Sequence, residues 1–224
     1  MGLFNLFKKK KMYLYSETEL DEYEAFITKN FGSYEEVFHE IVSPDIHLDI
    51  IVVPPTEENP FYKLVTMGVG AYKMHVPEEL KQYELEHMEL VMYLPKEWNV
   101  KSSEEKDYWP IRYMKILGRL PITQKTWLGV HHTVQANAEE SPFAENTNLN
   151  NILLMPGMNL KYDFLDLRLS SGKKINFYQM FPIYQEELEY KNQYSVNELI
   201  ELFEDEDIIP VLNLNRRNYG KAAE

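Results

Sequence analysis

The spacing of apolar residues predicts a helix near the start of the chain. Ser16 and Glu19 have the spacing of a capping box, in which each side chain bonds the backbone amide of the other residue. Apolar residues then recur at helical intervals between positions 20 and 27, and Gly32 follows as a stop signal. The first helix is therefore expected to begin after Ser16 and to end before Gly32.

Two further helices are predicted in the second half of the chain. Residues 109–120 carry a broad apolar face, and Pro110 fits the first turn of such a helix because that turn needs no amide donor. Ser195 and Glu198 form a second capping box, ahead of apolar residues at helical spacing from 196 to 203.

Runs of β-branched and alternating apolar residues predict the strands of a sheet. The predicted strands cover residues 47–53, 61–69, 88–94, 127–134, 162–169, 174–181 and 208–214, and residues 149–155 are a further apolar run. The alternation in 88–94 is typical of a strand with one buried face. Ser170, Ser171 and Gly172 separate two of the runs, which predicts a β-hairpin with Gly172 at a left-handed turn position. Residues 136–148 are polar and are expected to form a loop.

No repeat, low-complexity tract or linker divides the chain, so these elements are assigned to one domain. The 224 residues are 44% hydrophobic, which suffices for a sizeable core. The expected fold is α+β, with a mixed, mostly antiparallel sheet and three to four flanking helices. Residues 1–15 are expected to form a basic, flexible tail, and residues 16–218 to form the domain.

The charge balance favours a basic partner over nucleic acid. The net charge is −13, from 36 acidic and 23 basic residues, and this field repels phosphates. It attracts a basic protein, although solubility alone accounts for an acidic composition equally well. The chain has no cysteine, which excludes disulfides and thiol catalysis and is compatible with the cytoplasm as its location.

The first eleven residues join a short apolar stretch to four lysines, at positions 8 to 11. The apolar part is too short for a signal peptide, and Leu6 stands where a myristoylation signal needs Ser or Thr. A frayed tail is the favoured interpretation, and an amphipathic contact of Phe4, Leu6 and Phe7 with a membrane stays open. No other apolar run has the length of a membrane span, so a soluble protein without stable membrane insertion is expected.

Motifs of metal and nucleophile chemistry are missing from the sequence. His47 and Asp49 share one face of a strand, whereas His131 and His132 would lie on opposite faces and could not chelate one ion. There is no Gly-x-Ser-x-Gly elbow, and the glycines at 68 and 70 lack the rest of a phosphate loop. A hydrolase would need His132 or Asp49 to gain a coherent partner in the fold. No catalytic residue, metal site or cofactor is assigned.

A series of Pro, Gly and Trp landmarks lies in order along most of the chain. They are Pro54-Pro55-Thr56, Pro60-Phe61, Leu64-Val65-Thr66-Met67-Gly68, Leu94-Pro95 with Trp98, Trp109-Pro110-Ile111, Thr126-Trp127-Leu128-Gly129, His132-Thr133, Pro142-Phe143 and Pro182-Ile183-Tyr184-Gln185-Glu186-Glu187-Leu188. This series resembles the Suppressor of Fused domain family over about residues 37–215. The landmarks shape a fold and include no nucleophile or metal cage, so the resemblance implies a binding module and not an enzyme.

The resemblance implies two kinds of protein partner. Animal members of the family regulate a developmental signalling pathway and bind a transcription-factor peptide as an added strand, between this type of domain and a second one. That second domain is not expected here. Bacterial members are short single domains, many of them found beside polymorphic toxins and assigned as immunity proteins. The expectation is an immunity protein that neutralises a basic toxin stoichiometrically; the alternative is a signalling or scaffold adaptor that binds an endogenous peptide by strand addition.

Candidate partner-binding residues are the polar and aromatic members of the landmark segments and of one acidic run. They are His47, Asp49, Tyr93, Trp127, His132, Gln179, Tyr184, Glu187, Glu204 and Asp205. Tyrosine and tryptophan anchor many protein interfaces, and carboxylates steer basic partners. Each of these residues has a structural alternative, and for Trp127 a core position is the stronger interpretation.

Overall fold

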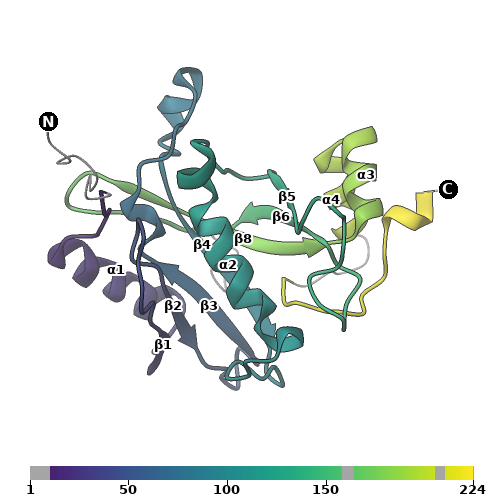
Figure 1. Cartoon of the computed structure of the whole chain (residues 1–224), viewed down its shortest axis with the longest axis horizontal. Helices are drawn as coiled ribbons and strands as arrows, with labels where there is room; N and C mark the ends of the chain where they lie inside the picture. Colours follow the sequence, from purple (N-terminus) through teal and green to yellow (C-terminus); the bar gives the residue numbers. More distant parts are fainter. Residues whose placement is uncertain (1–10, 158–163, 205–209, 224) are drawn as a thin grey trace, which may run out of the picture.

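The computed structural model describes residues 11–157, 164–204 and 210–223, and within them eight strands form one mixed sheet with four α-helices against it (Figure 1). The strands are β1 (Glu36–Phe38), β2 (Asp49–Val53), β3 (Phe61–Met67), β4 (His87–Pro95), β5 (Thr133–Gln135), β6 (Asn151–Pro156), β7 (Asp166–Arg168) and β8 (Lys174–Ile183). The α-helices are α1 (Glu17–Asn30), α2 (Glu105–Gln124), α3 (Gln185–Gln193) and α4 (Val196–Glu204), and the 3₁₀ helices are η1 (Val69–Ala71), η2 (Glu78–Tyr83) and η3 (Gly220–Ala223).

The order of strands across the sheet is β1-β2-β3-β4-β8-β6-β5, and β7 pairs with β8 beside this path. Neighbours are antiparallel in every described pair except β4 with β8, which are parallel. The prediction of an α+β fold with a mixed, mostly antiparallel sheet and three to four flanking helices is confirmed.

Local signals placed several elements correctly. The Ser16 hydroxyl accepts the amide of Glu19 at 3.3 Å, and the Glu19 carboxylate accepts the amide of Ser16 at 2.9 Å, so α1 begins with the predicted capping box. The Ser195 hydroxyl likewise accepts the Glu198 amide at 3.2 Å where α4 begins. β7 and β8 form the predicted hairpin, with Gly172 at φ 88° in its turn; residues 162 and 163 of that prediction lie outside the described residues.

Helices cover both faces of the sheet. Side chains alternate along β8, so Tyr178 and Met180 join the apolar cluster under α2, while Phe177 joins the cluster under α1. Further along the same face as Phe177, Phe181 and Ile183 pack with residues of α3 and α4. Figure 1 shows α2 crossing one face of the sheet, with α1 and α3 at different ends of the molecule.

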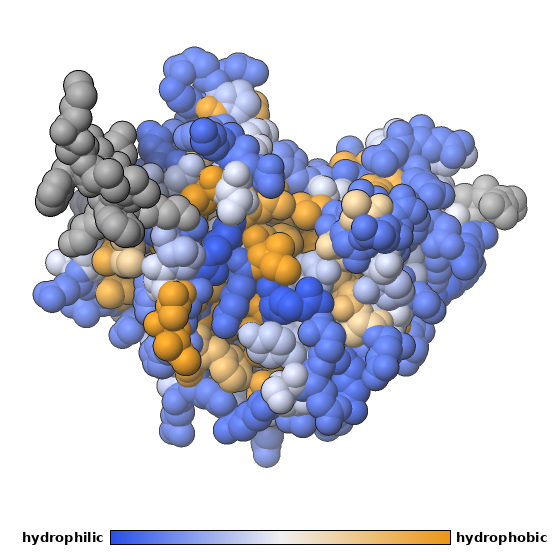
Figure 2. Space-filling view, in the orientation of Figure 1, coloured by the Kyte–Doolittle hydropathy of each residue, from blue (hydrophilic) through white to orange (hydrophobic). Residues whose placement is uncertain are grey.

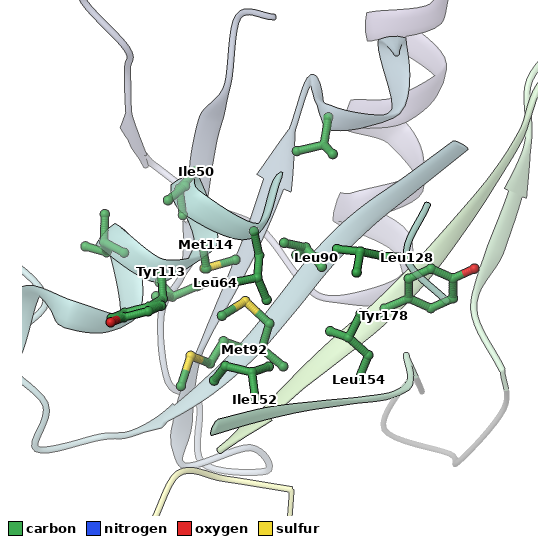
Figure 3. Close-up of a cluster of buried hydrophobic side chains, with 14 of the residues drawn as sticks. Ile50, Leu64, Leu90, Met92, Tyr113, Met114, Leu128, Ile152, Leu154 and Tyr178 are labelled. Carbon is green, nitrogen blue, oxygen red and sulfur yellow. The ribbon is translucent and has the colours of Figure 1, made fainter. Parts of the chain in front are cut away.

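The largest apolar cluster lies between α2 and the sheet. Figure 3 shows Leu64, Leu90 and Met92 of the central strands gathered with Tyr113 and Met114 of α2. Each fully buried side chain of this size stabilises the fold by roughly 1.5–3 kcal/mol relative to exposure.

The prediction that 88–94 form a strand is confirmed, but the prediction that one face is exposed is wrong. Residues 88 to 94 are buried on both faces, including Glu89 at 0% exposure and Tyr93 at 5%. Neither face of β4 is exposed to solvent, because the apolar cluster under α1 covers the face that is turned away from α2.

Helix α2 is longer than predicted, and its first proline lies deeper. The helix begins at Glu105, so Pro110 stands in its second turn and not in its first. A proline inside a helix leaves the carbonyl four residues earlier without its usual donor. Here the side-chain amide of Asn146 donates to the Lys106 carbonyl at 3.0 Å and replaces the missing bond.

Two predicted strands are wrong in extent. Of residues 127–134, only the last two belong to a strand, β5, because the chain turns at His131, where φ is 70°. Of residues 208–214, the first two lie outside the described residues, and the rest form a single parallel bridge, between Val211 and Tyr93.

Candidate protein-binding surface

The C-terminal segment, residues 210–219, crosses the sheet beside the separating ends of β4 and β8. The registered pairing of β4 with β8 ends at Val91 and Gln179. Beyond that point the Leu212 amide donates to the Tyr93 carbonyl at 2.9 Å, and the Gln179 side-chain amide donates to the Pro210 carbonyl at 2.8 Å. Two of the predicted site residues, Tyr93 and Gln179, therefore fasten this segment to the sheet.

A buried ion pair holds the same segment against α3. Arg216 binds both oxygens of Glu187, from Nη1 at 2.5 Å and from Nη2 at 2.6 Å. The carboxylate also accepts the amides of Tyr184 and Tyr219 at 2.9 and 3.1 Å. The Tyr184 hydroxyl donates to the Arg216 carbonyl at 2.8 Å. Glu187 is fully buried, so its carboxylate holds α3 to the C-terminal segment and is not accessible to a partner.

Carboxylates and tyrosines of α3 surround a hollow of about 470 Å³ on the outer side of this helix. We call this the α3 surface; it is lined by Glu186, Glu189, Tyr190, Gln193, Tyr194, Gly220 and Lys221. The rings of Tyr190 and Tyr194 lie 4.6 Å apart, and Tyr194 is 51% exposed. Figure 2 shows this end of the molecule, at the right of the view, as mainly hydrophilic.

The charge of Glu186 is held in place at the edge of the hollow. Its carboxylate contacts Lys221 Nζ at 3.1 Å and accepts the Asn218 side-chain amide at 2.7 Å. Burial favours the neutral form of Glu186, but hydrogen bonds from its own amide, from Asn218 and from Lys221 outweigh burial and lower its pKa. Glu189 is exposed and adds a second carboxylate. The surface therefore presents negative charge beside aromatic rings, a combination that suits a basic protein.

His47 and Asp49 lie together elsewhere, at the start of β2. The buried Asp49 carboxylate contacts His47 Nε2 at 3.2 Å and His39 Nδ1 at 2.8 Å, and it accepts the Glu40 amide at 2.9 Å. Their side chains thus meet as their spacing in the sequence indicates. The contacts tie the loop between β1 and β2 to the start of β2.

Ser43, His47 and Asp49 contact one another in the order serine, histidine, aspartate, as in the triad of a serine hydrolase, since Ser43 Oγ lies 2.8 Å from His47 Nδ1. The hydroxyl of Ser43, however, donates to Glu40 Oε2 at 2.9 Å. A nucleophilic serine must direct its hydrogen to the histidine that removes it, and here the hydrogen points to a carboxylate. The arrangement is a structural hydrogen-bond network.

Trp127 and His132 form a third group, in the turn before β5. Their rings lie 4.4 Å apart at 62°, and both side chains are half-buried. Burial and the nearby Lys191 lower the pKa of His132. Lys191 of α3 also donates to the Thr133 hydroxyl at 2.7 Å, which links this turn to the helix that carries the α3 surface.

The ten predicted residues thus fall into separate places. Tyr93, Gln179, Tyr184 and Glu187 gather around the C-terminal segment, and the two pairs His47–Asp49 and Trp127–His132 lie apart from it. Glu204 ends α4, and Asp205 lies outside the described residues.

The exposed residues of the α3 surface were missed by the sequence analysis. Tyr190 and Tyr194 follow the last landmark, and α3 itself is too polar to show an apolar stripe. One usable signal was charge order, because α3 has Glu186 and Glu187 in its first turn and Lys191 in its last, as the helix dipole favours.

Within the described residues, no group of three or more His, Cys, Asp or Glu side chains is placed to hold a metal ion. None of the described helices combines the length and apolar composition that a bilayer span requires.

Comparison with known proteins gives one family. The family model of the Suppressor of fused protein (SUFU) matches residues 44–217. A curated relative, an uncharacterized protein of Ureaplasma parvum serovar 3, is 24% identical over 212 residues, which cover 93% of this chain and 99% of the relative.

Solved structures share the fold at lower identity. A putative SUFU homolog from Neisseria gonorrhoeae FA 1090 matches with a TM-score of 0.61 and 18% identity, over 88% of this chain and 94% of that chain. A chain of a Sufu–Fu complex matches with a TM-score of 0.62 and 14% identity, over 92% of both chains. Drosophila Suppressor of Fused matches with a TM-score of 0.55 and 12% identity, over 91% of this chain and 50% of that one. Since the family model spans most of its length, the chain belongs to the Suppressor of Fused family.

Proposed function

We propose that this protein is a non-enzymatic binding module of the cytoplasm that acts as an immunity protein, neutralising a basic toxin by one-to-one binding. The α3 surface carries the proposal. It places two carboxylates and two tyrosine rings in contact around one hollow, on a helix that a buried ion pair joins to the C-terminal segment. The family supports the protein-binding part of the proposal, since a matching solved structure is that of a Sufu–Fu complex.

The physical properties of the chain suit such a partner. The net charge of −13 raises the rate at which a basic protein arrives, and the tyrosines supply contact area with little loss of side-chain entropy. Glu198 and Glu201 of the neighbouring helix α4 are exposed and extend the negative surface. A rigid support matters because a binding surface that is already ordered loses less entropy when the partner arrives.

The test begins with the protein as bait in a lysate of its source cells that contains the products of neighbouring genes. A basic partner is expected, and its toxic activity should fall to zero at an equimolar ratio when the two purified proteins are titrated. A partner whose activity persists at molar excess of this protein would contradict the immunity role.

Charge reversal on the α3 surface and on the neighbouring helix α4 should slow association with that partner. We expect Glu189→Lys with Glu201→Lys to lower the association rate about tenfold at low salt and much less at 0.5 M salt, because salt screens exposed charges. Stopped-flow association at several ionic strengths measures this. Glu57→Lys with Glu58→Lys is the matched control, since both residues are exposed and the net charge changes equally. Equal rates for the two double variants would remove the α3 surface from the proposal.

The second candidate function is an adaptor that binds an endogenous peptide by strand addition. It is favoured by β5, which ends the order of strands and pairs on one side with β6. A peptide bound there should slow amide hydrogen exchange at Thr133 and Gln135 by tenfold or more. Unchanged exchange in β5 under saturating peptide would exclude this mode.

A further inference from the structure

The outer face of α3 presents two kinds of group that bind cations, carboxylates and tyrosine rings. Five residues of α3 and its C-cap line the hollow of about 470 Å³: Glu186, Glu189, Tyr190, Gln193 and Tyr194. They recur at intervals of three and four positions, so their side chains share one face of the helix. A cavity of about 150 Å³ is large enough for benzene, so this hollow has room for a long side chain and water.

The two carboxylates at the hollow differ in their partners. Glu186 contacts Lys221 Nζ at 3.1 Å, and the Lys221 side chain is 67% exposed. Glu189 accepts the side-chain amide of Gln185 at 3.2 Å, and within the described residues no lysine or arginine lies at ion-pair distance from it. One carboxylate therefore faces a cation that solvent reaches easily, and the other can accept a cation from outside the molecule.

The tyrosine rings at the hollow can also take a cation. The rings of Tyr190 and Tyr194 lie 4.6 Å apart at 41°, and Tyr194 is 51% exposed. In the part of the chain that the structure describes, no lysine or arginine lies over either ring. The face of a tyrosine ring attracts a cation, and the attraction grows when the cation loses part of its water.

The inner side of the same helix shows what a glutamate and a tyrosine bind together. Arg216 binds both oxygens of Glu187, and its Cζ lies 5.0 Å from the centroid of the Tyr184 ring. One guanidinium thus satisfies a carboxylate and covers a ring at once. The outer side of α3 repeats these two residue types without an arginine of its own among the described residues.

Arg112 shows the same combination in a separate part of the fold. Its Nε donates to Glu105 at 2.8 Å, and its Cζ lies 4.5 Å from the centroid of the Tyr113 ring. Arginine suits both groups better than lysine does, because the planar guanidinium pairs with a carboxylate through two donors and stacks on a ring. The lysine ammonium is compact and strongly hydrated.

From these observations we infer that the hollow of the α3 surface receives an arginine side chain of the partner, whose guanidinium pairs with Glu189 and stacks on the ring of Tyr194. This assignment rests on the proposed function, in which a basic protein binds at this surface. The kind of partner it names is a protein with an arginine that projects from its own contact face.

Lys221 competes with the arriving arginine for Glu186. Its place depends on Gly220, since a Cβ at that position would lie 2.4 Å from the Glu186 carbonyl oxygen. The missing side chain lets η3 lie close against the first turn of α3, and Figure 1 shows the two helices beside each other at the C-terminal end of the chain. Lys221 thereby covers part of the negative charge until a stronger ligand displaces it.

The first test uses free ligands and no toxin. The tripeptides glycine-arginine-glycine and glycine-lysine-glycine, with both ends blocked, are titrated into the full chain and followed by nuclear magnetic resonance. We expect saturable shifts at the amides of residues 186–194, and about fivefold tighter binding of the arginine tripeptide, because only a guanidinium pairs through two donors and also stacks. Equal affinities, shifts centred outside α3, or no saturable shift would overturn the inference.

Variants assign the contacts within the hollow. Glu189→Gln and Tyr194→Leu alter exposed side chains and should each weaken binding of the arginine tripeptide about threefold. Lys221→Gln should strengthen it about threefold, because the competing ammonium is gone. Lys101→Gln is the matched control, since Lys101 is 75% exposed and contacts Glu36 at 3.3 Å. Equal tightening by the two lysine variants would mean that overall charge alone acts, and would overturn the inference.

The same measurements separate the arginine site from the immunity role. An arginine tripeptide that does not bind, while a toxin is neutralised at an equimolar ratio, would remove the arginine site and keep the proposed function. Tripeptide binding at α3 without neutralisation of the basic partner would keep the arginine site and remove the immunity role.

Discussion

We expect the protein to lose stability between pH 5 and pH 8, and we expect Glu89→Gln to remove most of that loss. Glu89 lies in β4 at 0% exposure. One carboxylate oxygen accepts the hydroxyl of Tyr15 at 2.8 Å and the amides of Gly68 and Gly70 at 2.9 Å each. The other oxygen accepts the Thr66 hydroxyl at 2.5 Å. Burial raises the pKa of Glu89 to about 7, although these hydrogen bonds oppose the rise.

The direction of the pH effect follows from this shift. An unfolded glutamate titrates near pH 4.5, so the folded state holds the proton more tightly than the unfolded state does. The resulting contribution to the free energy of unfolding is complete below pH 4.5 and is lost as the pH rises through 7. Its size is on the order of 3 kcal/mol, since each unit of pKa difference corresponds to about 1.4 kcal/mol.

Glutamine resembles the protonated side chain. Its oxygen can keep the donors Tyr15, Gly68 and Gly70, and its amide can donate to the Thr66 hydroxyl oxygen. Urea unfolding of the protein and of Glu89→Gln at pH 5 and pH 8 measures the effect, and Glu58→Gln is an exposed control. Comparison with the unmodified protein separates Glu89 from the half-buried His87, whose pKa is lowered by its partial burial. An unchanged pH dependence in Glu89→Gln would refute the assignment.

Glu89→Ala should behave differently and destabilise the protein at every pH. It leaves two buried amides and two buried hydroxyls without their acceptor, and each unsatisfied group costs about 1–3 kcal/mol. A loss of at least about 3 kcal/mol is expected, measured by the same urea titration. A milder effect than that of Glu89→Gln would indicate that water replaces the carboxylate.

The role of Glu89 shows where sequence patterns stop being informative. Because Glu89 alternates with apolar residues, it was predicted to face solvent. An alternating pattern shows which residues share a face of the strand, but it does not show what packs on each face. Burial comes from Tyr15, Tyr23 and the rest of the cluster under α1, distant in sequence. The glycines at 68 and 70, which lack the rest of a phosphate loop, allow close approach of the backbone: Gly68 has φ 113°, and a Cβ there would lie 1.9 Å from the His47 carbonyl oxygen. The hydrogen bonds from their amides to the buried Glu89 carboxylate form only in the folded sheet.

Local chemistry, by contrast, was readable in the sequence. The capping residues of α1 and α4 and the turn glycine at 172 act within a few positions, so their roles follow from the local sequence. Only part of the region around α3 could be predicted from the sequence. Tyr184 and Glu187 were selected, but their buried contacts with Arg216 depend on a segment that returns from the far end of the chain.

Replacing one partner of the Glu187–Arg216 ion pair should destabilise the fold, and the double variant should lose less stability than the two single variants added together. Glu187→Gln leaves a guanidinium that is only 8% exposed without its counter-charge, and such a change typically costs 3–5 kcal/mol. Arg216→Met leaves the opposite charge buried and should cost a similar amount. In the double variant no buried charge remains, while methionine can still fill the space among the rings of Phe181, Tyr184 and Phe203 that the guanidinium covers.

We therefore expect the double variant to be destabilised by clearly less than the sum of the single variants, by about 2 kcal/mol or more. Urea unfolding of all four proteins gives the coupling energy directly. Amide exchange adds a local readout: the single variants should release Leu212 and Tyr219, whose amides bond to β4 and to Glu187, before the central strands exchange. Additive losses with uniform exchange would mean that Arg216 contributes packing alone, and the α3 surface would then depend on its neighbouring rings for support and not on the buried charge pair.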